Sequence, residues 1–68
     1  EMGDWAPVDL AIPDGTPCEL RFDNAIECYE DAGPFFLHDD GHWYRIEPPM
    51  QVADVPTHFR PLSWLLQL

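Results

Sequence analysis

Eight prolines, spread from Pro7 to Pro61, are the feature that most limits what this 68-residue chain can form. Proline lacks an amide hydrogen and its ring clashes with the preceding turn of a helix, so few windows remain for a helix of average length. Strands joined by turns are therefore the expected elements. Because a chain this short buries only about 60% of its unfolded surface, we expect residues 1–68 to form one small acidic β domain.

A first hairpin is predicted by the alternation of apolar and polar residues in segments 18–22 and 26–30. A three-residue loop, residues 23–25, places apolar residues opposite apolar residues, whereas a two-residue loop mixes polar with apolar on both faces. The three-residue loop is therefore the preferred interpretation. The direct pairs are then Phe22 with Ile26, Leu20 with Cys28 and Arg21 with Glu27.

A second hairpin is predicted around Asp40-Gly41, which favours a type I′ turn between segments 35–39 and 42–47. This register makes a core face from Phe35, Leu37, Tyr44 and Ile46. It makes a reverse face from Phe36, His38, Trp43 and Arg45, where the guanidinium can lie on an aromatic ring.

The remaining segments complete the predicted sheet. Residues 30–34 are interpreted as the turn between the two hairpins, which gives an antiparallel meander of four strands, and residues 57–60 are a candidate fifth strand. The apolar tail, residues 62–68, is either a strand or one short helical turn that covers an open face of the sheet. Four apolar residues near the start are expected to pack there too: Trp5, Val8, Leu10 and Ile12. The predicted fold class is mainly all-β.

The cysteine and histidine residues are not spaced as in a metal site. Cys18 and Cys28 lie diagonal to one another in the predicted register, a poor geometry for a disulfide, and are interpreted as small buried apolar residues. His38 and His42 flank two aspartates, but the type I′ turn places the imidazoles on opposite faces. We expect no metal and no cofactor.

Catalytic groups are also few. Ser63 is the only serine, Cys28 is predicted to face the core, and His58 has no recognisable partner at short range. Nucleophilic catalysis requires a nucleophile, a base, an orienting group and a pocket. We therefore expect that the protein is not an enzyme.

Charge is the remaining signal, since 13 acidic residues stand against three arginines and no lysine, for a net charge of −10. So few cations disfavour binding to nucleic acid or to an anionic membrane and favour a basic protein partner. The predicted sheet gathers Asp23, Asp39 and Asp40 at one end and Glu30, Asp31 and Glu47 at the other. The candidate partner-binding residues are Glu19, Asp23, Glu27, Glu30, Asp31, Asp39, Asp40 and Trp43.

Three motifs near the ends of the chain resemble those of a family of small uncharacterised phage and prophage proteins. The motifs are Trp5-Ala6-Pro7-Val8, Pro13-Asp14-Gly15-Thr16-Pro17 and Pro56-Thr57-His58-Phe59-Arg60-Pro61-Leu62. They cover roughly a third of the chain. Phe59 stands where that family usually has Trp, and an apolar tail replaces a polar, proline-rich one. The resemblance implies a phage origin and a β-rich fold, and it assigns no catalytic residues.

The small size and strong acidity also resemble those of anti-CRISPR inhibitors, several of which occupy the DNA-binding surface of a CRISPR surveillance complex. This resemblance implies a monomeric, phage-encoded inhibitor that blocks target DNA by acidic mimicry of its phosphates. The alternative is a non-enzymatic phage accessory or structural module that self-associates or docks through an aromatic face.

The expected location is the cytoplasm of a host bacterial cell, because no basic start is followed by an apolar stretch and no apolar run reaches 18 residues. Glu1 precedes Met2, so we expect Met2 to be the natural first residue.

Overall fold

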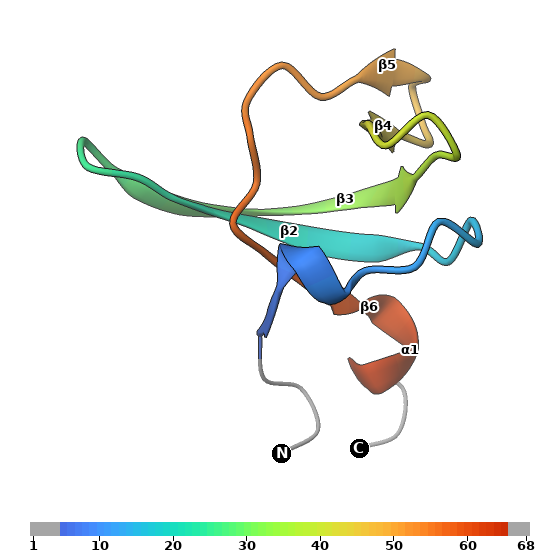
Figure 1. Cartoon of the computed structure of the whole chain (residues 1–68), viewed down its shortest axis with the longest axis horizontal. Helices are drawn as coiled ribbons and strands as arrows, with labels where there is room; N and C mark the ends of the chain where they lie inside the picture. Colours follow the sequence, from blue (N-terminus) through green and yellow to red (C-terminus); the bar gives the residue numbers. More distant parts are fainter. Residues whose placement is uncertain (1–4, 66–68) are drawn as a thin grey trace.

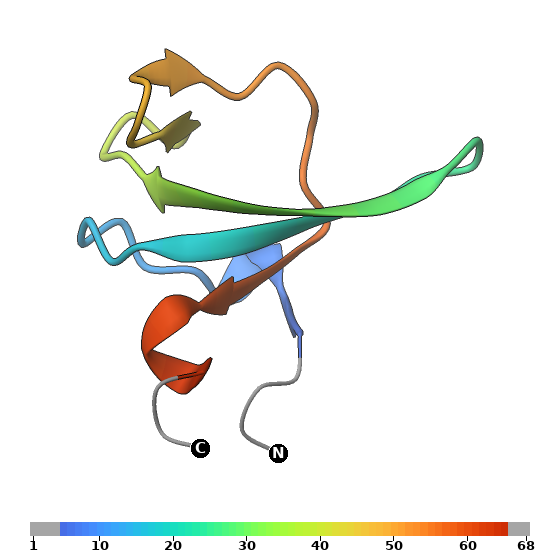
Figure 2. The same ribbon diagram turned by 180° about the vertical axis from the view of Figure 1, so that it is seen from behind.

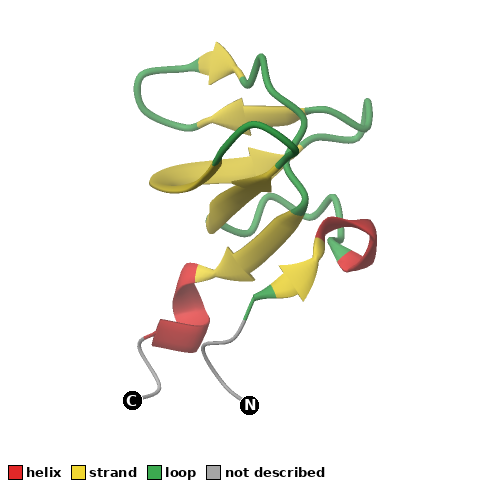
Figure 3. Ribbon diagram, turned by 90° about the vertical axis from the view of Figure 1, so that its left-hand side faces the viewer, coloured by secondary structure: helices red, strands yellow, loops and turns green. Residues whose placement is uncertain are grey.

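The fold is a mainly antiparallel β-sheet, as predicted. The computed structural model describes residues 5–65, within which the sheet has six strands in the order β1-β6-β2-β3-β4-β5 (Figure 1). The strands are β1 (Ala6–Pro7), β2 (Cys18–Asp23), β3 (Cys28–Leu37), β4 (Trp43–Arg45), β5 (Met50–Gln51) and β6 (His58–Pro61). The 3₁₀ helix η1 (Val8–Leu10) and the single helical turn α1 (Leu62–Leu65) lie beside β1 and β6, at one edge of the sheet (Figure 3).

The hydrophobic core lies on one face of the sheet. Alternate residues of β2 point into it, because successive side chains of a strand face opposite ways, and Leu20 at its centre is completely buried. The buried residues that form this core are Cys18, Leu20, Phe22, Phe35, Trp43 and Phe59. The predicted inward face of β2 is thus confirmed.

The first hairpin has a different register from the one predicted. Asp23 pairs with Cys28, so residues 24–27 form a four-residue loop. The Asn24 carboxamide oxygen accepts hydrogen bonds from the amides of Ile26 and Glu27, both 2.9 Å, which holds the longer loop closed. Apolar matching had favoured Ile26 opposite Phe22, but Ile26 is 94% exposed at the tip of the hairpin.

Tyr29 takes the place opposite Phe22 that was expected for Ile26. The two rings stack with their centroids 4.8 Å apart and 13° between their planes. The same shift moves Cys28 out of the core, so its predicted burial is wrong. Cys18 pairs with Phe35, far along β3 from Cys28, and both thiols are free.

The predicted turn at residues 30–34 is not a turn. The chain runs straight on as the ten-residue strand β3, with an irregularity opposite the Cys18–Leu20 part of β2. Gly33 lies in this irregular part of β3 and has a φ of +69°. Its amide donates to the Asp31 carboxylate at 3.0 Å. Two predicted strands are therefore halves of one strand about 30 Å long, whose course is visible in Figures 1 and 2. Asp23 pairs with Cys28 at the start of β3 and Asp39 follows its end, so the two carboxylates lie at opposite ends of the strand.

The second hairpin closes through a three-residue loop rather than a type I′ turn. The His38 amide donates to the His42 carbonyl and the Gly41 amide donates to the His38 carbonyl, both at 2.9 Å. A type I′ turn needs a positive φ at both central residues, and only Gly41 of the pair Asp40-Gly41 has one. The loop is thus a tight turn followed by a left-handed glycine.

This loop moves the register of β4 by one residue and so exchanges its two faces. Leu37 pairs with Trp43 and Phe36 pairs with Tyr44, which turns Trp43 into the core and Tyr44 outward. The predicted core positions of Tyr44 and Ile46 are therefore wrong, as are the outer positions of Trp43 and Arg45, since Arg45 lies over the ring of buried Phe35. Within β3, the faces of Phe35, Phe36 and Leu37 were predicted correctly, whereas those of Cys28 and Tyr29 were not.

The ends of the described chain complete the sheet. Strand β6 confirms the predicted fifth strand and inserts between β1 and β2. Val8 packs against the core as predicted, whereas Leu10 and Ile12 are 66% and 70% exposed. The tail forms a helical turn over Leu62–Leu65, and its last three residues lie outside the described part. Within residues 5–65, no helix has the length and apolar character needed to cross a membrane.

Candidate functional site

The arginine on β6 is held by an internal carboxylate. Arg60 donates to Glu19 through two nitrogens, Nη2 at 2.6 Å and Nε at 2.8 Å, and both side chains are mostly buried, 20% and 15% exposed. The guanidinium carbon lies 4.3 Å from the centroid of the Trp5 ring. This two-point ion pair under an aromatic ring joins β6 to β2 across the outer face of the sheet.

The other two arginines are held in the same way. Arg21 donates to Glu30 at 2.8 Å across the β2–β3 pair, and it also lies 3.8 Å from Asp23. Arg45 donates to Asp31 at 2.9 Å and stacks over the core ring of Phe35. Every arginine of the chain therefore faces a carboxylate of the chain, and four of the predicted contact residues, Glu19, Asp23, Glu30 and Asp31, are in these pairs.

The carboxylates outside these ion pairs include a group at the end of the molecule where β3 ends. Asp14 and Asp39 line one shallow depression there, and Asp40 follows directly. The loop before β2 and the loop after β3 lie at this same end in both views (Figures 1 and 2). We call Asp14, Asp39 and Asp40 the acidic end.

Two members of the acidic end are held ionised by local hydrogen bonds. Asp14 accepts the Thr16 amide at 3.0 Å, and the Thr16 side chain and amide together lower the pKa of Asp14. Asp40 accepts the Tyr44 hydroxyl at 2.6 Å and the His42 amide at 2.8 Å. These two bonds, the Tyr44 one first, lower the pKa of Asp40. The loops thus fix where the negative charge is presented.

The structure separates residues that sequence reasoning had grouped. Asp23 and Glu27 lie at the projecting tip of the β2–β3 hairpin, at the opposite end of β3 from Asp39 and Asp40 (Figure 1). Trp43 is 7% exposed and lies in the core, not on the outer aromatic face where it was predicted. Of the predicted contact residues, Asp39 and Asp40 lie together at the acidic end. Asp14, which lines the same depression as Asp39, was not among them.

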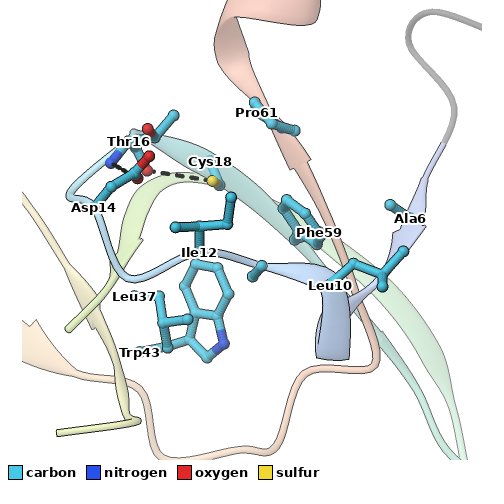
Figure 4. Close-up of a pocket in the computed structure, with 11 residues that line it drawn as sticks. Ala6, Leu10, Ile12, Asp14, Thr16, Cys18, Leu37, Trp43, Phe59 and Pro61 are labelled. Carbon is cyan, nitrogen blue, oxygen red and sulfur yellow. Dashed lines mark hydrogen bonds between the residues drawn. The ribbon is translucent and has the colours of Figure 1, made fainter. Parts of the chain in front are cut away.

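An apolar cavity of about 300 Å³ opens beside the acidic end, where segment 10–16 crosses the face of the sheet (Figure 4). Figure 4 shows Ile12 over the Trp43 indole, with Leu37 beside it and Asp14 at the rim. The full lining is Ala6, Leu10, Ala11, Ile12, Asp14, Thr16, Cys18, Leu37, Trp43, Phe59 and Pro61. Sequence reasoning assigned Leu10, Ile12, Cys18 and Leu37 to the core and Trp43 to the outer face. The only signal of a cavity was two large aliphatic residues before a proline-rich turn.

Metal binding finds no geometric support in the described part of the chain. Residues 5–65 contain no group of three or more histidine, cysteine or carboxylate side chains that could hold an ion. Of the histidines near the acidic end, His38 accepts the Asp40 amide at Nδ1, 3.1 Å away, and packs against the Tyr44 ring.

Comparison with known proteins leaves this site without a template. The chain matches no protein-family model, no curated protein and no solved structure.

The two thiols are expected to differ sharply in reactivity. Burial raises the pKa of Cys18 to about 11, so about one molecule in a thousand carries the thiolate at pH 8. Cys28 is exposed, although desolvation and the neighbouring Asp23 raise its pKa as well. A disulfide reagent should modify one thiol per native chain, and none in Cys28→Ser. Rapid modification of two thiols in the native protein would contradict the burial of Cys18.

Proposed function

We propose that the protein is a non-enzymatic binding domain that docks its acidic end on a basic surface of a partner protein. The observation that carries the proposal is the internal pairing of all three arginines, at Glu19, Glu30 and Asp31. No lysine exists to offset the other carboxylates. Within residues 5–65, the acidic end therefore pairs with no arginine, and its one basic contact is the His38 imidazole, 3.5 Å from Asp40.

Carboxylates that no cation offsets mainly affect how fast and with which partners the protein associates. Complementary potentials steer a basic partner toward the acidic end, raise the association rate and discriminate against acidic partners. The effect weakens as salt rises, since the screening length falls from about 10 Å at 0.1 M to about 3 Å at 1 M.

In the most specific form of this proposal, the protein is a phage-encoded inhibitor that competes with target DNA. Its partner is then the DNA-recognition surface of a CRISPR surveillance complex. The protein's small size, its acidity and the likeness of its motifs to phage proteins support this form. The carboxylates that would replace phosphates are those of the loops, because the strand carboxylates Glu19, Glu30 and Asp31 already hold arginines.

A second candidate is an accessory module that docks or self-associates through an aromatic face. The rings of Phe36 and Tyr44 stack at 5.9 Å, and His38 packs on both. These partly exposed rings favour a contact that salt does not screen. Size-exclusion chromatography at low and high salt distinguishes the two, since dimerisation that is insensitive to salt would support the aromatic contact.

Neutralising the acidic end should weaken partner binding. In the triple variant Asp14→Asn, Asp39→Asn and Asp40→Asn, each amide loses the charge and keeps one acceptor oxygen for a backbone amide of its loop. At Asp40 the second oxygen, which accepts the Tyr44 hydroxyl, is replaced by an NH2 group. Exposed charge pairs contribute about 0.2–1 kcal/mol each, so inhibition of target-DNA binding by surveillance complexes should become about tenfold less potent. The measurement is DNA-binding competition at low salt with a panel of purified complexes.

The matched control removes the same number of charges elsewhere, with Asp9→Asn, Glu27→Gln and Glu47→Gln. We expect this variant to retain most of the potency. Equal loss in the two variants would mean that net charge, and not the acidic end, determines binding. DNA binding that is unchanged by excess protein across the panel would rule out the CRISPR form.

A further inference from the structure

We infer that the apolar cavity and the acidic end form one recognition site for a short basic segment of the partner that carries a large apolar side chain. The apolar side chain enters the cavity beside Ile12 and Trp43, while the flanking Lys or Arg residues lie on Asp14 and Asp39. The inference rests on the proposed function and deepens it, because it states which partner sequence the acidic end selects.

The wall of the cavity is the first support. Leu10 and Ile12 remain mostly exposed although they stand at the mouth of an apolar cavity whose floor contains Trp43 and Phe59. Exposed large aliphatic residues that border a cavity are typical of a surface completed by another molecule. Elsewhere in segment 5–17, Val8 and Ala11 do pack against the core, so the segment is anchored while its two largest aliphatic side chains stay open.

The size of the cavity limits what can enter. Apolar cavities of about 150 Å³ hold one benzene ring. The space of about 300 Å³ therefore admits one or two large apolar side chains, such as Leu next to Phe.

The carboxylates at the rim of the cavity determine which charge the partner segment must carry beside its apolar side chain. Asp14 belongs to the cavity lining, and it also lines the neighbouring depression with Asp39. Leu37 borders both hollows, so the apolar and the acidic parts are continuous. Within the described residues, the three arginines are engaged with carboxylates elsewhere in the chain. An apolar side chain flanked by cations complements this surface, whereas an apolar side chain flanked by acids is repelled.

The test uses two synthetic peptides of equal charge, capped at both ends, with sequences Arg-Arg-Leu-Phe-Arg-Lys and Arg-Arg-Ser-Gly-Arg-Lys. We expect the first to bind the whole protein about tenfold more tightly at 150 mM salt, because burial of a large apolar side chain adds to the charge attraction. Amide resonances of Leu10, Ile12 and Leu37 should shift with the first peptide and much less with the second.

Paired variants locate the contact. Leu10→Ser with Ile12→Ser should reduce the affinity for the apolar peptide to that of the polar peptide, without unfolding, since both side chains are largely exposed. The control, Ile26→Ser with Val55→Ser, changes two exposed aliphatic residues elsewhere and should leave binding unchanged.

The outcomes separate the two proposals. If both peptides bind equally, with an affinity that falls as salt rises, the cavity inference is overturned and the acidic end retains its proposed function. If neither peptide binds at low salt, both proposals fail. A loss of apolar-peptide binding in the Ile26 and Val55 variant as large as in the Leu10 and Ile12 variant would also overturn the inference.

Discussion

Replacement of Leu20 by alanine should unfold a large fraction of the protein. Leu20 is completely buried at the centre of β2, with strands on both sides of it. Such substitutions cost about 2–5 kcal/mol, through lost burial and the cavity left behind. A domain of this length has roughly 3–10 kcal/mol of stability in total, so the loss is comparable with the whole. Chemical denaturation followed by circular dichroism measures it.

The same substitution at Leu10 is the matched control. Leu10 is 66% exposed, so Leu10→Ala removes little buried surface and should cost less than about 1 kcal/mol. A comparable loss at the two positions would contradict the position of Leu20 in the core.

Replacement of Gly33 by alanine should cause the second large loss. The φ of Gly33 is +69°, and a β-carbon there would lie 2.6 Å from the backbone nitrogen of Phe35 and 2.6 Å from its ring. The left-handed conformation costs a non-glycine residue about 1–2 kcal/mol. The clash adds to this cost because the Phe35 backbone and its buried ring cannot move without disturbing the core. We expect a total loss of at least about 3 kcal/mol, measured by thermal and chemical unfolding.

Gly15→Ala isolates the conformational part of this cost. Gly15 has a φ of +81° in the turn before β2, but nothing lies within 4 Å of its would-be β-carbon. The loss should therefore be about 1–2 kcal/mol. If Gly33→Ala lowers the free energy of unfolding by no more than Gly15→Ala does, the close approach of residue 33 to Phe35 is contradicted.

The two registers show where inference from residues alone went wrong. The first register was predicted by matching apolar residues and the second from the type I′ preference of Asp40-Gly41, but the loops give a different register in both cases. The Asn24 carboxamide closes a longer loop at residues 24–27, and at Asp40-Gly41 only the glycine takes a positive φ. Each change shifts which residues face the core, so Tyr29 stands opposite Phe22 in place of Ile26, and Trp43 stands opposite Leu37 in place of Tyr44.

The candidate site was only partly visible in the sequence. The excess of carboxylates predicted a basic partner, and the Asp39-Asp40 loop was among the expected contact residues. Asp14 and the cavity beside it were not predicted. Their proximity to Asp39 depends on the path of segment 10–16 over the sheet, and that path is set by contacts such as the Val8 amide with the Thr57 carbonyl, 49 positions apart.

The sequence by itself determined the class of fold, the alternation of β2 and the negative charge, because proline chemistry, side-chain period and residue counts are local properties. Tertiary structure alone decided which carboxylates are neutralised and which remain available. Glu19 is neutralised by Arg60, 41 residues away, because β6 inserts beside β2. Such pairing depends on strand order and register, which arise from long-range packing and loop hydrogen bonding that no short segment encodes.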